Sequence, residues 1–226
     1  MNPLANPTHQ PFSWRLIRMS AGFFVFALGI VMTINANIGL APWDVFHQGL
    51  SKVMGITFGQ AGILVGAVIV VIDYAAGERI GWGTLGNMLM IGLFIDLIML
   101  NGWVPEQQVF MWGIFQMMAG IFIIGIGSYL YISVGLGCGP RDGLMVALLK
   151  KTGRSVRLVR GIIESGALLC GWLLGGTVGL GTVIMALVAG PVIQWSFALL
   201  RFDVKAVEHE YMDHYLRTLG KRLRNS

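Results

Sequence analysis

The chain has 226 residues, of which 55% are hydrophobic and only 12% are charged. Soluble domains carry about 25% charged residues, so this composition excludes an ordinary water-soluble fold and predicts a chain surrounded by lipid. The net charge of +5 does not indicate nucleic-acid binding, because the basic residues are spread over the ends of the apolar segments.

Six apolar segments are close to the roughly 20 residues that a helix needs to cross a membrane. In chain order they cover residues 16–36, 58–76, 82–100, 110–134, 158–174 and 180–200. None of them alternates apolar and polar residues in the manner of a barrel strand. The first is too long for the apolar region of a signal peptide, so we expect it to be retained. The sequence therefore predicts an all-α membrane protein with six transmembrane helices.

The distribution of Lys and Arg predicts the orientation, because basic residues favour the cytoplasmic side of a membrane. If six helices span the membrane starting from inside, 15 of the 16 basic residues lie in inner segments and only Lys52 lies outside. We therefore expect both termini in the cytoplasm, with residues 1–14 as an N-terminal tail.

Two short motifs interrupt the series of apolar segments. Residues 38–44 read IGLAPWD after the first segment, and residues 136–142 read LGCGPRD after the fourth. Each motif predicts a helix start, because proline suits the first turn and a preceding glycine permits a sharp bend. The helices would cover residues 42–54 and 140–151, and at about 1.5 Å per residue they are too short to cross. They would be re-entrant half-helices or interfacial helices; a third alternative, in which both span, gives eight transmembrane helices.

The two motifs belong to a longer internal repeat. Residues 12–98 align without a gap with residues 110–196, at a shift of 98 positions and with 21 identities. Such self-similarity indicates a repeated architecture. Each copy holds three spans, an odd number, so the second copy must cross the membrane in the opposite direction. We expect two inverted repeats, residues 15–101 and 102–200, a design in which transporters bind their solute near the bilayer midplane.

The inverted repeat would bring the N-termini of the two short helices together, where free N–H groups favour a negatively charged group. The candidate substrate-binding residues are Asn37, Gly39, Pro42, Trp43, Asp44, His47, Cys138, Gly139, Pro140, Arg141 and Asp142. Trp43 would form a flat wall and Arg141 would bind a carboxylate, sulfonate or phosphate, while the two aspartates would pair with it or handle protons. In the structural alternative, the motifs only start two helices, Trp43 anchors the interface and Arg141 pairs with Asp142.

Three polar residues inside the apolar segments are secondary site candidates: Asp96, Glu164 and Gln194. Asp96 aligns with Gln194 across the repeat, which keeps a polar residue at one symmetry-related place. Glu164 follows Arg160 by four residues, so an ion pair on one helix face is its expected structural role.

Two further patterns have structural explanations. His47 shares one polar stripe at helical spacing with Asp44, Gln48 and Ser51, and we expect this stripe to be a solvated face. The glycines in the apolar segments, such as Gly120, are expected to permit close packing of helices.

Enzyme chemistry is not indicated by the sequence. It contains no metal-ligand spacing, no phosphate-binding loop and no nucleophile–base pattern. We therefore expect no catalytic residues, no metal and no cofactor.

Residues 201–226 follow the last apolar segment and carry a rough apolar stripe that ends in basic residues. They predict a cytoplasmic amphipathic helix. Three alternatives stay open for it: binding to the anionic inner membrane surface, packing on a second protomer in a homodimer, or exposure to solvent.

The chain resembles the bacterial YczE/YitT/YyaS family of integral membrane proteins, most closely its YczE branch. The resemblance rests on IGLAPWDVFHQGLS at 38–51, GLGCGPRDGLM at 135–145, KKTGRSVR at 150–157 and the pair IGWGT and VGLGT. It covers roughly residues 15–200. It implies a small multi-span protein of the bacterial inner membrane and implies no particular substrate.

Two functions from different classes fit these features. The first is a secondary transporter or channel for a small polar or anionic solute, with membrane lipid and the solute as partners and the paired motifs as the central site. The second is a non-transporting accessory protein that assists a membrane or biosynthetic complex. The second predicts that the polar residues pair internally and leave no solvated cavity at the interface of the two repeats.

Overall fold

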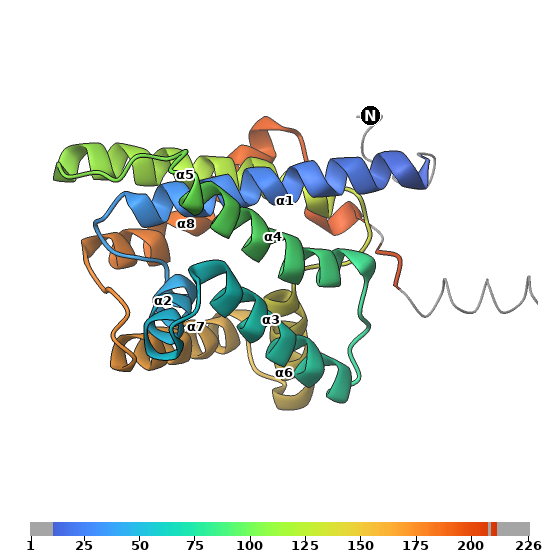
Figure 1. The fold of residues 1–226 in the computed structure, drawn as a ribbon. Coiled ribbons are helices and arrows are strands. Elements are labelled where there is room, and N and C mark those ends of the chain that lie inside the picture. Colours follow the sequence, from blue (N-terminus) through green and yellow to red (C-terminus); the bar gives the residue numbers. More distant parts are fainter. Residues whose placement is uncertain (1–10, 208, 212–226) are drawn as a thin grey trace, which may run out of the picture.

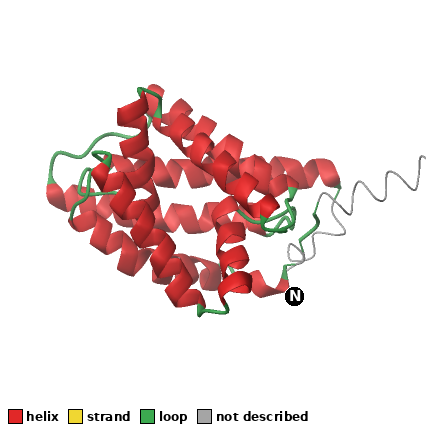
Figure 2. Cartoon of the chain, turned by 90° about the horizontal axis from the view of Figure 1, so that it is seen from below, coloured by secondary structure: helices red, strands yellow, loops and turns green. Residues whose placement is uncertain are grey.

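The computed structural model describes residues 11–207 and 209–211, which form eight α-helices and one short 3-10 helix (Figure 1). Figure 2 shows short loops between the helices and no strand in this part of the chain. The elements are α1 (Phe12–Asn35), α2 (Pro42–Met54), α3 (Phe58–Ala75), α4 (Trp82–Leu100), α5 (Phe110–Ile132), α6 (Pro140–Thr152), α7 (Val156–Leu173), α8 (Leu180–Leu199) and η2 (Val204–Ala206). The prediction of an all-α protein is confirmed.

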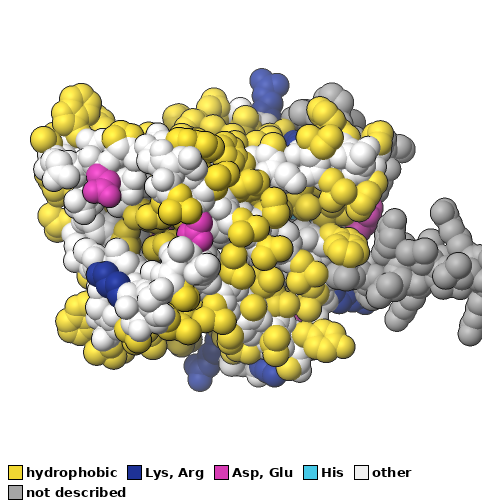
Figure 3. Space-filling model, in the orientation of Figure 1, with side chains coloured by type: hydrophobic (Ala, Val, Ile, Leu, Met, Phe, Trp, Pro, Cys, Tyr) yellow, Lys and Arg dark blue, Asp and Glu magenta, His cyan; other side chains and the backbone are white. Residues whose placement is uncertain are grey.

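Five helices, α1, α3, α4, α5 and α8, are long and apolar enough to cross a membrane. The sixth predicted span corresponds to α7, which carries Arg157, Arg160 and Glu164 and is not among these five. Large apolar side chains such as Leu100 and Leu187 are exposed on the outside of the molecule, and Figure 3 shows them spread over much of one face. An exterior of this kind suits contact with lipid, because lipid tails solvate apolar side chains.

The most extensive helix contact joins α1 to α5, which lie side by side along one side of the molecule (Figure 1). A Cβ atom at Gly29 would lie 2.7 Å from the carbonyl oxygen of Gly120, and one at Gly120 would lie 2.8 Å from that of Gly29. Side chains larger than glycine would therefore separate the two backbones. This confirms the expectation that glycines permit close helix packing.

The two short helices begin and end where the motifs predict. Proline occupies the first turn of both α2 and α6. Gly55 and Gly153 end them in the left-handed conformation, with φ of 66° and 63°, which glycine adopts without steric cost. The observed bounds of α2 equal the predicted ones, and α6 extends one residue further, to Thr152.

Each short helix packs on a helix from the other half of the chain. Helix α2 lies against α7, and α6 lies against α3. The loops that precede them make matching contacts: the Gly83 N–H donates to the Leu136 carbonyl at 2.7 Å, and the Gly181 N–H donates to the Ile38 carbonyl at 2.8 Å. These two hydrogen bonds are related by the same 98-residue shift as the sequence repeat.

The chain after α8 returns to the start of α1. We call its described part, residues 202–207 and 209–211, the C-terminal strap. The Glu210 carboxylate lies 3.1 Å from the buried guanidinium of Arg15, and the Glu210 N–H donates to the Gly135 carbonyl at 2.7 Å. Most of the amphipathic helix predicted at 201–226, and residues 1–10 of the predicted tail, lie outside the described residues.

Candidate functional site

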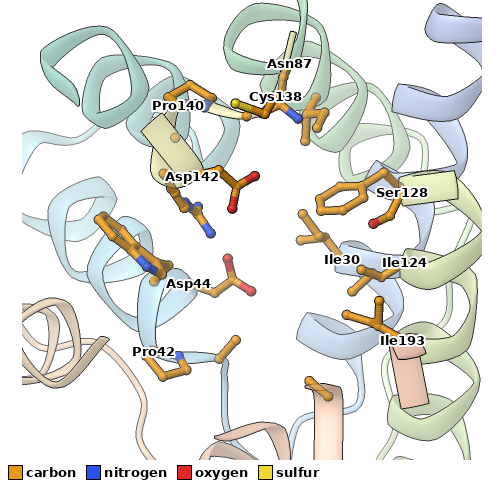
Figure 4. A pocket seen from close by; sticks show the side chains of 18 of the residues that line it. Ile30, Pro42, Asp44, Asn87, Ile124, Ser128, Cys138, Pro140, Asp142 and Ile193 are labelled. Carbon is orange, nitrogen blue, oxygen red and sulfur yellow. The ribbon is translucent and has the colours of Figure 1, made fainter. Parts of the chain in front are cut away.

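A cavity of about 770 Å³ lies inside the helix bundle and is lined by residues from all eight helices (Figure 4). Pro42 and Pro140 both line it, so the first turns of α2 and α6 open onto the same space. In Figure 4 the side chains of Asp44 and Asp142 point into the space between these two turns. The structure thus brings the two motifs together around one cavity.

Arg141 forms the centre of the polar wall of this cavity. Its Cζ atom lies 4.7 Å from the centroid of the Trp43 ring, a cation–π distance. Its Nη2 atom lies 3.3 Å from His47 Nε2. Because arginine can only donate, Nε2 of His47 accepts this hydrogen bond, so the imidazole is neutral and carries its proton on Nδ1. That nitrogen lies 3.7 Å from Asp44 Oδ1.

The charged residues on this wall differ in the fraction of their surface that is exposed. Asp44 is buried, with 5% of its surface exposed. Arg141 and Asp142 are exposed, and because both line the cavity, that exposed surface faces its interior. Among the salt bridges of the described residues, none joins Arg141 to Asp44 or Asp142.

The opposite wall of the cavity is largely apolar. Figure 4 shows Ile30 of α1, Ile124 of α5 and Ile193 of α8 facing the aspartates, with the Ser128 hydroxyl beside them. The cavity therefore has one charged side, formed by α2 and α6, and one largely apolar side, formed by α1, α5 and α8, to which Ser128 and Gln194 add polar groups.

The C-terminal strap also contributes to the lining, through Val204 and His209. Burial lowers the pKa of the His209 imidazole, because a partly buried ring is harder to charge. Nδ1 of this ring has no hydrogen-bond partner among the described residues. The strap is thus part of the cavity wall as well as a contact to α1.

Most predicted site residues line the cavity: Pro42, Trp43, Asp44, His47, Cys138, Gly139, Pro140, Arg141, Asp142, Glu164 and Gln194. Three do not. Asn37 and Gly39 lie in the loop before α2 with φ of 56° and 122° and shape its bend. Asp96 accepts hydrogen bonds from the Gly59 N–H at 2.8 Å and from the Thr57 hydroxyl, so it stabilises the start of α3.

The prediction that one stripe of α2 is a solvated face is wrong. Asp44 and His47 are both buried, and Gln48 accepts a hydrogen bond at 2.7 Å from the backbone N–H of Thr177. The reason is that α7 and the cavity cover this side of α2. In contrast, the predicted ion pair on α7 is confirmed, with Arg160 Nε 2.8 Å from Glu164 Oε1.

The sequence reasoning missed the burial of Asp73 near the end of α3, where we find 3% of its surface exposed. Its Oδ1 atom has no hydrogen-bond partner in the described part of the chain, and its Oδ2 lies against Gly143 of α6. The repeat alignment held a signal for this contact. Asp73 aligns with Gly171 and Gly143 aligns with Val45, and Gly171 packs against the backbone of Val45 and Phe46, so the aligned positions also meet in the other half.

The fold and the cavity define an all-α membrane protein with a polar internal site. The chain belongs to a family of unknown function, DUF6198, whose model matches residues 13–197. It is 37% identical over 180 residues to the uncharacterized membrane protein YczE of Bacillus subtilis, covering 78% of this chain and 82% of that protein.

Two other relatives support the same membership. An uncharacterized protein of Haemophilus influenzae is 34% identical over 187 residues, covering 80% of this chain and 85% of that protein. YyaS of Bacillus subtilis is 23% identical over 181 residues, covering 76% and 87%. No solved structure matches the chain. The resemblance to YczE and YyaS read from the motifs is confirmed.

Proposed function

We propose that this protein is a secondary transporter or channel for a small polar or anionic solute, which binds in the central cavity. In this proposal the two halves are inverted repeats, six helices span the bacterial inner membrane and both termini are cytoplasmic. Helices α2 and α6 are re-entrant half-helices, and Arg141 holds the negative end of the solute. The protein performs no catalysis.

The observation that carries the proposal is that the first turns of α2 and α6 line one cavity. Helix N-termini carry free N–H groups and a positive dipole end, which favour a negatively charged group. In membrane proteins, irregular backbone at the depth of the hydrocarbon is tolerated where protein buries it or where it lines a water-filled cavity. Paired broken helices at the interface of two repeats are the arrangement in which transporters bind solutes.

The matching contacts of the two halves support the repeat. The hydrogen bonds from Gly83 and Gly181 to the loops of the opposite half are equivalent under the 98-residue shift. So are the contacts of α2 with α7 and of α6 with α3. With α7 counted as the sixth span, each half contributes three long helices and one short one, as an inverted pair requires.

Binding is tested by thermal unfolding of the purified protein in detergent. The probes are sodium salts of small carboxylates, sulfate and phosphate, together with amino acids and water-soluble vitamins. A ligand at 100 times its Kd stabilises the folded state by about 2.7 kcal/mol, which raises Tm by about 5–10 °C in a chain of this size. We expect Arg141→Ala to abolish the shift, whereas Arg154→Ala, an equal charge change at an exposed site outside the cavity lining, retains it.

Transport is tested separately, by counterflow of the stabilising compound into proteoliposomes. We expect uptake with the natural protein and with Arg154→Ala, and none with Arg141→Ala. Binding without uptake would reject transport and favour the accessory function. The absence of any stabilising probe, or full retention of the shift by both Arg141→Ala and Asp44→Asn, would reject the central site itself.

A further inference from the structure

The charges that line the cavity specify more about the solute than its polarity. Five lining residues carry full charges: Asp44, Asp142, Glu164, Arg141 and Arg160. Arg160 and Glu164 are paired with each other at 2.8 Å, so they offset one another. The charge that faces the solute therefore comes mainly from Arg141 and the two aspartates, with Arg160 also attracting Asp142.

These three groups are not paired among themselves. Arg141 contacts the Trp43 ring and the neutral His47, and no salt bridge of the described residues joins it to either aspartate. Charges inside a membrane are costly and are normally paired or solvated. A solute that carries both signs would provide each of these groups with its partner.

The balance of charge also selects between solute classes. If both aspartates are ionised, two carboxylates and one guanidinium leave one excess negative charge on this wall. A monoanion would bind to Arg141 but would add a second negative charge beside the aspartates, and an amine would leave the guanidinium unpaired. A zwitterion matches both signs and adds no net charge.

The apolar wall specifies the rest of the solute. Ile30, Ile124 and Ile193 face the aspartates across the cavity, so a largely apolar group at the far end of the solute fits this side. The cavity of about 770 Å³ is within the range of about 300–1,000 Å³ that small-molecule sites occupy.

Resting on the proposed central site, we propose that the solute is a small zwitterion with an apolar body, of the class of the apolar α-amino acids. Its carboxylate binds to Arg141, its ammonium group binds between Asp44 and Asp142, and its side chain contacts the isoleucine wall. Trp43 holds the guanidinium in place through the cation–π contact, and His47 accepts one further hydrogen bond from it.

Four matched compounds test this class on the natural protein. L-leucine has all three features, isocaproate lacks the ammonium group, isoamylamine lacks the carboxylate, and glycine lacks the apolar body. Binding is measured by the shift in Tm and by titration calorimetry, with L-methionine and L-phenylalanine as further members of the class. We expect at least one of the three apolar amino acids to bind, and each truncated compound to bind at least about tenfold more weakly.

Two variants test whether the solute binds to the polar wall of the cavity. Arg141→Ala is expected to abolish binding of the amino acid, and Asp44→Asn to weaken it, while Arg154→Ala has no effect. If Arg141→Ala fails to fold, Arg141→Lys replaces it, because it keeps the charge and loses the planar fork. The comparison of the four compounds needs no variant and decides the class by itself.

The outcomes separate this inference from the proposed function. Tighter binding of isocaproate than of leucine overturns the zwitterion and leaves an anion site intact. Tighter binding of isoamylamine overturns it in favour of a cation. If no apolar amino acid binds while another anion in the wider panel does, only the inference is lost; if nothing binds, the central site is lost as well.

Discussion

Gly29 and Gly120 allow the backbones of α1 and α5 to approach closely where the helices cross. In Gly120→Ala the new Cβ would lie 2.8 Å from the Gly29 carbonyl oxygen and 2.9 Å from Thr33 Cγ2. Overpacking of this kind costs about 1–3 kcal/mol. We expect Tm in detergent to fall by about 2–12 °C, at roughly 2–4 °C for each kcal/mol.

The matched control for this change is Gly166→Ala, in α7. A Cβ at Gly166 would have no neighbour within 4 Å, and alanine is the better helix former by about 1 kcal/mol. This variant should melt at or above the temperature of the natural protein. Equal melting of the two variants would show that the crossing of α1 and α5 is not close-packed.

Residues in the two motifs could be predicted as site candidates because proline, glycine and aspartate have strong local preferences. The side-chain contacts between the two motifs could not be predicted. The repeat predicts that the starts of α2 and α6 meet, but the contact of Arg141 with Trp43 depends on how the two side chains are oriented there, and the alignment carries no such information. His47 was misplaced for the same reason, since a polar stripe facing a cavity looks in the sequence like one facing water.

At the scale of the element, the C-terminal strap distinguishes the two ends of the cavity. It follows α8 and contributes Val204 and His209 to the lining, and Glu210 ties it to Arg15 and to Gly135 in the loop before α6. Arg15 also donates to the Val134 carbonyl at 2.9 Å. Arg15, at the start of α1, is therefore joined to the strap by an ion pair and to the loop after α5 by a hydrogen bond.

Removal of this ion pair should open the cavity at the strap. Cys138 lines the cavity and reports on access to it, once exposed Cys170 is changed to serine. We expect Glu210→Ala to speed the reaction of Cys138 with a water-soluble maleimide by about tenfold, the effect of about 1.4 kcal/mol on opening. The control is Glu106→Ala, at an exposed site; equal rates in both variants would show that the strap does not close the cavity.

The elements themselves were largely predictable, and the strap was not. Apolar length predicted five of the long helices, and the Pro and Gly signals gave the bounds of α2 to the residue. The strap leaves no such signal, because its position depends on single contacts between Glu210, Arg15 and Gly135, which are far apart in the chain.

At the scale of the whole molecule, the two halves exchange their short helices. Helix α2 of the first half packs on α7 of the second, and α6 of the second packs on α3 of the first. Each half by itself therefore leaves uncovered the surface that the other half's short helix occupies. The two halves therefore interlock through their short helices and do not form two adjacent domains.

A cut in the exposed turn after Gly102 tests this interdependence. We expect residues 1–102 and 103–226, expressed separately, to be degraded or to aggregate, and the same two pieces expressed together to purify as one complex. The complex should bind the same ligand as the intact chain, because the cavity is rebuilt. Recovery of either piece alone as a monodisperse folded protein would contradict the exchange.

One aligned pair of positions places its glycine on opposite helices in the two halves. A Cβ at Gly143 in α6 would meet the Asp73 carboxylate of α3, and a Cβ at Gly171 in α7 would meet the backbone of Val45 and Phe46 in α2. Gly143 aligns with Val45, and Gly171 aligns with Asp73. The glycine therefore lies on the short helix in one interface and on the long helix in the other, so a substitution copied from one half to the aligned position of the other meets different neighbours.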